Sequence, residues 1–334
     1  MSSNPPTMLQ LLQRKTIVDC DTMDVEVPKT LGPFADCTSN QAIAYGELSK
    51  PENKALIQES VAAAEKYSRD FVTEVFSIRE LAGEIAMIKL QLRIAPYVTG
   101  FVHIQTNPVH SYNTPKTIEN AKRIIALFKL LDPSFDSKRV CIKIPSSWEG
   151  LRAILILKGD FQITTLATTL FVPEQYALAG EVGAHYIAPY VNELRVHFDT
   201  SFEDTSKAFR LCLEAQRYYE AYGLKTRVLP ASLTSTEEVM MLKGVHHITV
   251  SPPLLRGLAG MDAGENRPVS VFEREPEGFE VCEKREFGDD EEGWKSAFRG
   301  SAGGEGVRKL DDAIGIFTEM QVNMEKLMDP TPIS

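Results

Sequence analysis

A lysine inside a short β-branched segment is the side chain of this sequence with the clearest chemical potential. Residues 140–150 read Val-Cys-Ile-Lys-Ile-Pro-Ser-Ser-Trp-Glu-Gly. If the segment is a strand, Cys141 and Lys143 share one face and the three branched residues share the other. An amine in apolar surroundings loses its proton more easily, and a neutral amine can attack a carbonyl carbon to form a Schiff base. A structural lysine paired with an interior carboxylate is the alternative interpretation.

The segments around this lysine alternate as βα units do. The predicted strands are Thr16–Cys20, Phe34–Thr38, Gly100–Gln105, Val140–Ile144, Ile163–Leu170, His185–Pro189, Thr226–Pro230 and His247–Val250. The predicted helices are Lys54–Tyr67, Phe71–Leu92, Thr117–Leu131, Glu149–Leu157, Glu174–Val182, Thr205–Tyr222, Ser235–Leu242 and Pro253–Leu258. Eight alternations favour a single (β/α)8 TIM barrel over a doubly wound protein, since no GxGxxG follows the first strand. Lys143 then lies near the carboxyl end of a strand, where barrel active sites form.

The rest of the chain fits one barrel domain over residues 1–334. Residues 262–306 are acidic and rich in glycine, which predicts a solvated or partly ordered excursion. Within this stretch, Trp294 could cover the barrel mouth or anchor the loop. Residues 307–328 carry apolar side chains at helical spacing and predict a closing helix packed on the outside of the barrel.

Charge and cysteine usage exclude several classes of protein. The chain has 46 acidic and 36 basic residues, a net charge of −10, which argues against nucleic-acid binding. Five cysteines without a CxxC pair imply neither a disulfide framework nor a zinc site. The histidines lack metal-ligand spacing, so we expect no metal. No signal peptide or membrane span is evident, so we expect a cytoplasmic protein that does not bind membranes.

The segment around the lysine resembles the lysine motif of the transaldolase family, K-[IL]-[AP]-[ST]-[ST]-W-x-G. Further segments are similar to family motifs and follow in the same order. They are Cys20-Asp21-Thr22-Met23-Asp24, Asp36-Cys37-Thr38-Ser39-Asn40, Ser111-Tyr112, Thr168-Thr169-Leu170-Phe171, Ile187-Ala188-Pro189-Tyr190-Val191, Pro230-Ala231-Ser232 and His247 to Leu255. The resemblance implies a (β/α)8 barrel and Schiff-base chemistry on ketoses, with no metal or organic cofactor.

The same resemblance implies roles for five residues. Lys143 is expected to be the Schiff-base nucleophile. Asp21 is expected to be an acid/base or a partner of a substrate hydroxyl, and Asn40 a hydrogen-bond donor to the donor fragment. Thr168 would position a catalytic water, and Ser232 would hydrogen-bond the substrate.

The catalytic centre departs from the family pattern at three positions. Gln105 stands where the family has a catalytic Glu, and an amide cannot transfer protons as a carboxylate does. Tyr190 replaces the usual Phe, so its phenol could hold or protonate a water. The same pairing is found in the fructose-6-phosphate aldolase branch, whose members release the three-carbon fragment. Leu166 replaces an Asn, which removes a hydrogen bond. His103 shares a face with Gln105 and is either a pocket residue or a core histidine.

The phosphate site departs as well. Glu193 and Thr234 stand where the family uses arginines, and a carboxylate repels a phosphate dianion. Arg195 or Arg227 could substitute from nearby. The sequence therefore predicts an acceptor without phosphate, such as a cationic aldehyde that pairs with Glu193.

Three functions follow from these observations. The first is a Schiff-base aldolase or transaldolase-like enzyme that makes or breaks a C–C bond between a hydroxyketone and an aldehyde, both small-molecule carbonyl substrates. The second is ordinary transaldolase activity in the pentose phosphate pathway. The third is a noncatalytic barrel that binds a metabolite. We expect a monomer or a homodimer.

Overall fold

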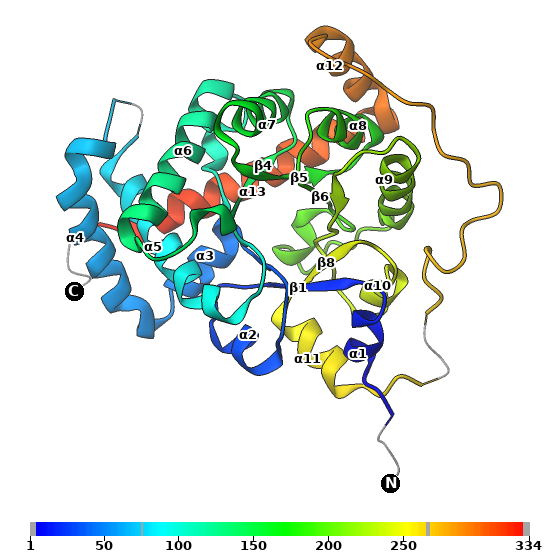
Figure 1. Cartoon of the computed structure of the whole chain (residues 1–334), viewed down its shortest axis with the longest axis horizontal. Coiled ribbons are helices and arrows are strands. Elements are labelled where there is room, and N and C mark those ends of the chain that lie inside the picture. The colour runs from blue at the N-terminus through cyan, green and yellow to red at the C-terminus, as the bar shows by residue number, and fades with distance from the viewer. Residues whose placement is uncertain (1–4, 75, 265–267, 330–334) are drawn as a thin grey trace.

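A ring of parallel strands forms the centre of the molecule (Figure 1). The computed structural model describes residues 5–74, 76–264 and 268–329. The strands are β1 (Ile17–Asp21), β2 (Cys37–Thr38), β3 (Val102–Gln105), β4 (Val140–Pro145), β5 (Thr164–Leu170), β6 (Tyr186–Pro189), β7 (Arg227–Val228) and β8 (His247–Val250). Their order is β7-β6-β5-β4-β3-β2-β1-β8, and the N–H of Thr249 donates to the carbonyl of Pro230 at 3.3 Å across the remaining seam. The predicted (β/α)8 barrel is confirmed.

Helices surround this ring. They are α1 (Met8–Gln13), α2 (Glu26–Leu31), α3 (Gln41–Leu48), α4 (Lys54–Phe71), α5 (Ile78–Ile94), α6 (Thr114–Leu131), α7 (Trp148–Phe161), α8 (Pro173–Glu181), α9 (Phe209–Ala221), α10 (Thr236–Met241), α11 (Pro252–Gly260), α12 (Glu291–Gly300) and α13 (Glu305–Leu327). The predicted helix from Phe71 begins later, because Val72 is extended and Ser77 caps α5 by accepting from the N–H of Glu80. Short 3-10 helices η3 (Pro108–His110) and η5 (Leu194–His197) follow β3 and β6.

Side-chain alternation along β4 explains how the barrel separates two buried regions. Val140, Ile142 and Ile144 belong to the apolar cluster shared with the surrounding helices. Cys141 belongs to a second cluster together with Leu166 of β5, Tyr186 of β6 and Leu229. The predicted orientation of the strand is therefore confirmed, and its remaining central residue, Lys143, points inward with Cys141.

The closing helix α13 crosses the carboxyl ends of the strands. It contacts α3, η3 and η5, which follow β2, β3 and β6 in the chain. Its Ala313 and Phe317 join the same buried cluster as Tyr190 and Leu194. In Figure 1, α13 is the orange-red helix that runs across the ring of strands. The predicted closing helix thus exists, and it covers part of the barrel mouth.

The acidic stretch before α13 is anchored by α12. Trp294 is 1% exposed, and its Nε1 donates to the carbonyl of Glu174 at 3.0 Å. The centroid of its ring lies 4.8 Å from that of Phe298 and 5.8 Å from that of Trp148. Residues 265–267 of the stretch lie outside the described part of the chain. Of the two alternatives for Trp294, the structure thus shows the anchor: the residue packs against α7 and α8 and does not line the lysine cavity.

All five cysteines are free thiols, and burial raises the pKa of Cys37 and Cys141 well above the ordinary value. Among the described helices, none has the length and apolar composition needed to cross a bilayer.

Replacing the anchoring indole tests this arrangement. We expect Trp294→Ala to lower the free energy of unfolding by about 3–5 kcal/mol, because it leaves a large cavity between α12 and the barrel. Urea denaturation of the purified protein measures the change. Val281→Ala is the matched control in the same stretch, since Val281 is 38% exposed and should cost less than about 0.5 kcal/mol. Equal effects of the two substitutions would show that α12 is not anchored.

Candidate active site

A cavity of about 460 Å³ opens at the carboxyl ends of the strands and contains the lysine of β4. Six residues predicted as site residues line it together: Asp21, Asn40, Lys143, Tyr190, Ser232 and Thr234. The remaining lining residues are Ala42, Ile43, Leu194, Val196, His197, Ala231, Leu233, Ser251, Pro253 and Leu254. The barrel thus brings residues from β1, β4 and the loops after β2, β6, β7 and β8 to one site.

Lys143 is buried in the barrel yet faces this cavity. The residue is 2% exposed, and its Nζ lies 5.9 Å from the centroid of the Tyr190 ring. Within the described chain, no carboxylate forms an ion pair with it. The structural interpretation requires an ion pair between this lysine and a carboxylate. The described residues form no such pair, although Asp21 lines the same cavity.

Two polar side chains on the neighbouring strands have no protein partner. Gln105 lies opposite Lys143 in the β3–β4 register, and Thr168 lies opposite Pro145 in the β4–β5 register. Both residues are almost fully buried, yet Oε1 and Nε2 of Gln105 and Oγ1 of Thr168 make no hydrogen bond in the described structure. Buried polar groups are nearly always satisfied, so these atoms leave hydrogen-bonding capacity open on the strands next to β4, although neither residue lines the cavity.

Local hydrogen bonds fix the side chains contributed by β1 and β2. Oδ1 of Asp21 accepts from the hydroxyl of Thr38 at 2.6 Å, and this hydroxyl also lies 2.5 Å from that of Thr249. Asn40 caps α3, since its Oδ1 accepts from the N–H of Ile43 at 3.0 Å. The cap uses the amide oxygen, and the described residues leave Nδ2 of Asn40 available for a ligand in the cavity.

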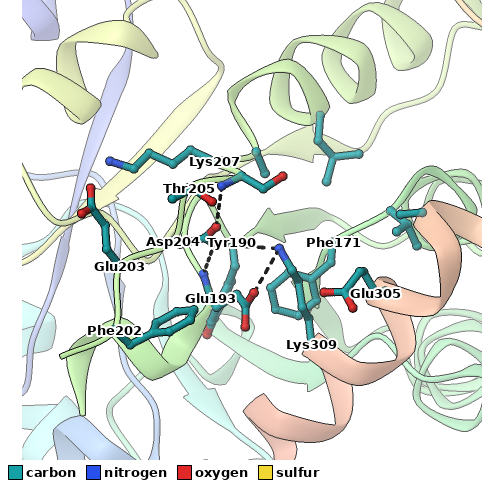
Figure 2. Close-up of a pocket in the computed structure, with 16 residues that line it drawn as sticks. Phe171, Tyr190, Glu193, Phe202, Glu203, Asp204, Thr205, Lys207, Glu305 and Lys309 are labelled. Atoms are coloured by element: carbon teal, nitrogen blue, oxygen red, sulfur yellow. Dashed lines mark hydrogen bonds and ion pairs between the residues drawn. The ribbon is translucent and has the colours of Figure 1, made fainter. Parts of the chain in front are cut away.

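Glu193 lies elsewhere than predicted. It lines a separate cavity of about 450 Å³, which shares Tyr190 with the lysine cavity (Figure 2). There its carboxylate accepts two hydrogen bonds from Arg308 of α13, at 2.7 and 3.1 Å, and lies 3.4 Å from Nζ of Lys309. The expectation that Glu193 faces the acceptor is therefore corrected, because two cations of α13 already neutralise it.

The other residues at the expected phosphate positions also have protein partners. The N–H and hydroxyl of Thr234 donate to Glu238 at 2.7 and 2.9 Å. Arg195 pairs with Asp199 at 2.7 Å, and Arg227 begins β7 at the opposite, amino end of the barrel. Neither arginine lines the lysine cavity, so neither restores the missing guanidinium.

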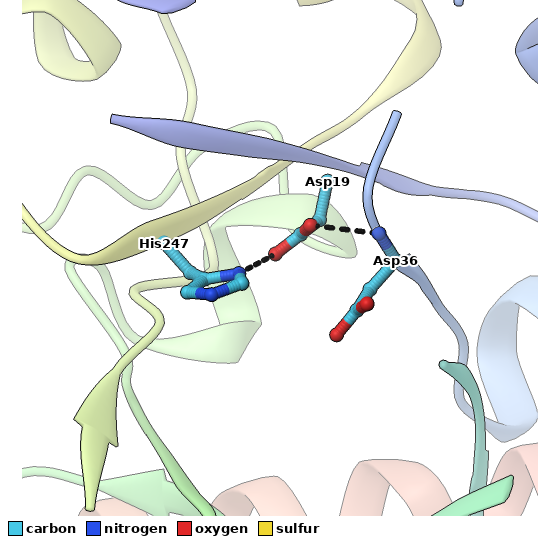
Figure 3. A group of neighbouring side chains, drawn as sticks. All are labelled: Asp19, Asp36 and His247. Carbon is cyan, nitrogen blue, oxygen red and sulfur yellow. Dashed lines mark hydrogen bonds and ion pairs between the residues drawn. The ribbon is translucent and has the colours of Figure 1, made fainter. Parts of the chain in front are cut away.

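His103 belongs to a buried cluster nearer the amino end of the barrel and does not line the lysine cavity. Its Nε2 lies 3.0 Å from Oδ2 of Asp36, whose N–H donates to Asp19, and Asp19 in turn contacts Nδ1 of His247 at 2.9 Å (Figure 3). Burial lowers the pKa of His247 to about 4 and raises that of Asp19. His103 is thus a core histidine, which corrects the prediction of a substrate contact.

The same cluster has the composition of a metal site. Ligand atoms of Asp19, Asp36 and His247 lie within 4.8 Å of one another. Each of these side chains also has a hydrogen-bond partner in the protein.

His197 is a titratable lining residue for which no role was predicted from the sequence. It ends η5, and its Nε2 lies 3.0 Å from Oγ of Ser232 in the cavity wall. Strand periodicity could not find it, because η5 leaves the strand direction after β6. The only signal in the sequence is a titratable ring close behind the segment that contains Tyr190.

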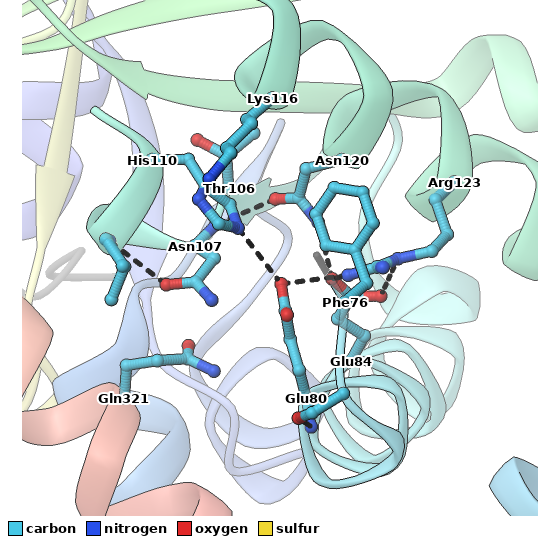
Figure 4. Close-up of polar contacts among 12 residues, drawn as sticks. Phe76, Glu80, Glu84, Thr106, Asn107, His110, Lys116, Asn120, Arg123 and Gln321 are labelled. Carbon is cyan, nitrogen blue, oxygen red and sulfur yellow. Dashed lines mark hydrogen bonds and ion pairs between the residues drawn. The ribbon is translucent and has the colours of Figure 1, made fainter. Parts of the chain in front are cut away.

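A buried polar network supports the end of β3 (Figure 4). Arg123 of α6 donates to Glu84 at 2.8 Å and to Glu80 at 2.9 Å, both on α5. Glu84 also accepts from Asn120, whose Oδ1 accepts from the N–H of Asn107 at 2.8 Å. Burial raises the pKa of Glu84 to about 7, although Arg123 opposes this shift. The network fixes the segment that follows Gln105.

A (β/α)8 barrel with a polar cavity at the carboxyl ends of its strands has the architecture of a barrel enzyme. A family model described as Transaldolase/Fructose-6-phosphate aldolase matches residues 18–291, and the chain belongs to this family. It is therefore a transaldolase-family enzyme.

Curated relatives are consistent with this assignment. A transaldolase of Histophilus somni (strain 129Pt) is 27% identical over 96% of this chain and 98% of the relative. One of Haemophilus influenzae (strain 86-028NP) is 28% identical over the same shares, and one of Actinobacillus succinogenes is 29% identical over 77% of this chain and 80% of the relative. Among solved structures, the chain is similar to an IMP dehydrogenase/GMP reductase-like protein of Corynebacterium glutamicum. The TM-score is 0.40 and the sequence identity is 12%, with 93% of this chain and 83% of that chain covered. This structure is too distant to bear on function.

Breaking the buried ion pairs tests the support of β3. We expect Arg123→Met to lower the free energy of unfolding by about 3–5 kcal/mol, because Glu80 and Glu84 lose their cation in a buried position. Chemical denaturation measures the change. Arg79→Met is the control, since its pair with Asp329 is exposed and should contribute less than about 1 kcal/mol. Similar losses in both variants would contradict the assignment of the network.

Proposed function

We propose that this protein is a Schiff-base aldolase or transaldolase-like enzyme that joins or separates a hydroxyketone donor and an aldehyde lacking phosphate. The observation that carries the proposal is the position of Lys143. Its side chain is buried at the carboxyl end of the barrel, faces a cavity, and has no carboxylate paired with it in the described structure. A residue in this position is accessible to a small ketone and shielded from bulk water.

The chemistry proposed for Lys143 begins with attack of the amine lone pair on the ketone carbonyl. The carbinolamine that forms loses water to give an iminium ion, and loss of a proton from the adjacent carbon gives an enamine. The enamine carbon then bonds to the aldehyde carbon, whose oxygen takes up a proton. Hydrolysis of the product iminium releases the ketose and regenerates the lysine, and cleavage follows the same steps in reverse.

Proton transfer in this proposal falls to groups around the lysine. Asp21 is the carboxylate of the cavity, held by Thr38, and is suited to exchange a proton with the hydroxyl formed or cleaved. The unpartnered atoms of Gln105 and Thr168 are suited to hold the water that enters and leaves the carbinolamine. Tyr190 supplies a phenol in the same cavity, and Asn40 is available to bind a donor hydroxyl, while the hydroxyl of Ser232 is engaged by His197.

The charge of the cavity favours an aldehyde without phosphate. Its lining residues include no arginine, and Lys143, the one lysine, is committed to the donor. A cationic acceptor is not proposed, because the carboxylate of Glu193 faces away from this cavity and is neutralised by Arg308.

Transfer between two sugars is the second candidate, and the curated relatives named transaldolase favour it. The two candidate functions differ in what removes the three-carbon fragment from the lysine, water or a second aldehyde. Release to water would make the protein a lyase, and delivery to a second aldehyde a transferase.

Covalent trapping tests the proposed lysine. We expect borohydride with dihydroxyacetone to add one reduced adduct to Lys143, because the reagent reduces the iminium to a stable amine. Peptide mass spectrometry locates the adduct, and Lys143→Met should abolish it. The same reaction on Lys129→Met, which alters an exposed lysine of α6 outside the cavity, is the control. An intact Lys143 across a broad panel of ketones would leave only the noncatalytic interpretation.

Acceptor choice tests the absence of a phosphate site. We expect the kcat/KM of aldol addition of dihydroxyacetone to glyceraldehyde to exceed that to glyceraldehyde 3-phosphate by about tenfold or more, since no guanidinium offsets desolvation of the phosphate. Fast transfer from fructose 6-phosphate to erythrose 4-phosphate, with a preference for phosphorylated acceptors, would instead establish ordinary transaldolase activity.

A further inference from the structure

The outer wall of the lysine cavity has an unusual composition. Most of it is apolar, formed by Leu194, Val196, Leu233, Pro253 and Leu254. The contact between His197 and Ser232 is a polar site within this wall, and the two residues come from the separate loops that follow β6 and β7.

The histidine retains an open hydrogen-bonding position. Its Nε2 is engaged by Ser232 at 3.0 Å, and the described residues provide no partner for Nδ1. His197 is exposed at the edge of the cavity. Partial burial of its ring lowers the pKa below its ordinary value, and the negative charges of Asp21 and Glu238 only partly offset this. A neutral imidazole has one donor and one acceptor, so either tautomer leaves Nδ1 able to bind a hydroxyl group.

The serine is held in a strained backbone conformation. Ser232 has a φ of 60°, a left-handed value that costs a non-glycine residue about 1 kcal/mol or more. Its carbonyl accepts from both the N–H and the Nδ2 of Asn192, at 3.2 and 2.8 Å. The conformation is thus imposed by its surroundings, as is common where a side chain must point into a functional site.

A buried carboxylate joins the two loops. Glu238 of α10 accepts from Nδ2 of Asn192 at 2.9 Å and from Thr234, and lies 2.8 Å from Nζ of Lys207. Asn192 precedes His197 in the loop after β6, and Thr234 follows Ser232 in the loop after β7. Glu238 therefore holds both residues of the pair in a fixed relation.

We propose that His197, positioned by Ser232, determines acceptor specificity by hydrogen-bonding a hydroxyl of an uncharged hydroxyaldehyde. The inference rests on the proposed function and adds the class of the second substrate. Binding energy at this point comes from neutral hydrogen bonds and not from a cation, so the acceptor is polyhydroxylated and carries no phosphate. Because the histidine and serine already satisfy each other in part, a deoxy acceptor loses rate moderately and is not rejected outright.

The experiment compares two acceptors of equal length, glyceraldehyde and propionaldehyde, with dihydroxyacetone as the donor. We expect wild-type protein to prefer glyceraldehyde in kcat/KM. His197→Phe should lower kcat/KM for glyceraldehyde by roughly 10–100-fold and change that for propionaldehyde by less than about threefold. His197→Asn, which places an amide near the position of Nδ1, should restore part of the preference.

Two controls separate this inference from the proposed function. Borohydride trapping of dihydroxyacetone on Lys143 reports the donor half-reaction and should be unchanged in His197→Phe. Phe198→Ala alters the neighbouring exposed ring, which does not line the cavity, and should keep the wild-type preference. If trapping fails in wild type, the proposed function is wrong. If trapping succeeds but wild type lacks the preference, or His197→Phe affects both acceptors equally, only the role of His197 is overturned.

Discussion

Side-chain alternation in a closed ring of parallel strands is the constraint on which this structure depends. Every second residue of each strand must point into the barrel, where a polar group needs a partner. Toward the amino end, Asp19, Asp36 and His247 meet this requirement by contacting one another and His103. Toward the carboxyl end, the side-chain amide of Gln105 and the hydroxyl of Thr168 have no such partner among the described residues.

Residues on strands could be predicted because alternation and strand order fix them together. The bounds of β8 agree with the sequence prediction, and Lys143 lies inward as the β4 pattern required. β2 and β7 are shorter than predicted, with two residues each, because the neighbouring segments leave the ladder early. Asp21 and Asn40 were predicted from the family resemblance alone. Each ends or directly follows a strand, so the barrel brings it to the same face as the lysine.

Residues on the loops could not be placed in this way. Glu193 bonds Arg308, which lies 115 residues further along the chain, and no local pattern reports a pair of such separation. His197 is positioned by Ser232 and by the shared carboxylate of Glu238, which ties two loops that are distant in sequence. Composition at the expected phosphate positions indicated that the arginines were missing. It could not indicate that the glutamate turns to a different cavity.

The position of α13 at the end of the barrel sequence affects the order in which parts of the molecule can fold during synthesis. The eight strands and the helices between them precede α13 in the chain, yet α13 supplies Phe317 beside Tyr190 and Arg308 to Glu193. During synthesis, a barrel can therefore form while its mouth still lacks this cover. Until α13 has been synthesised and docks, the apolar residues that it covers, such as Leu194, remain exposed at the carboxyl end of the barrel.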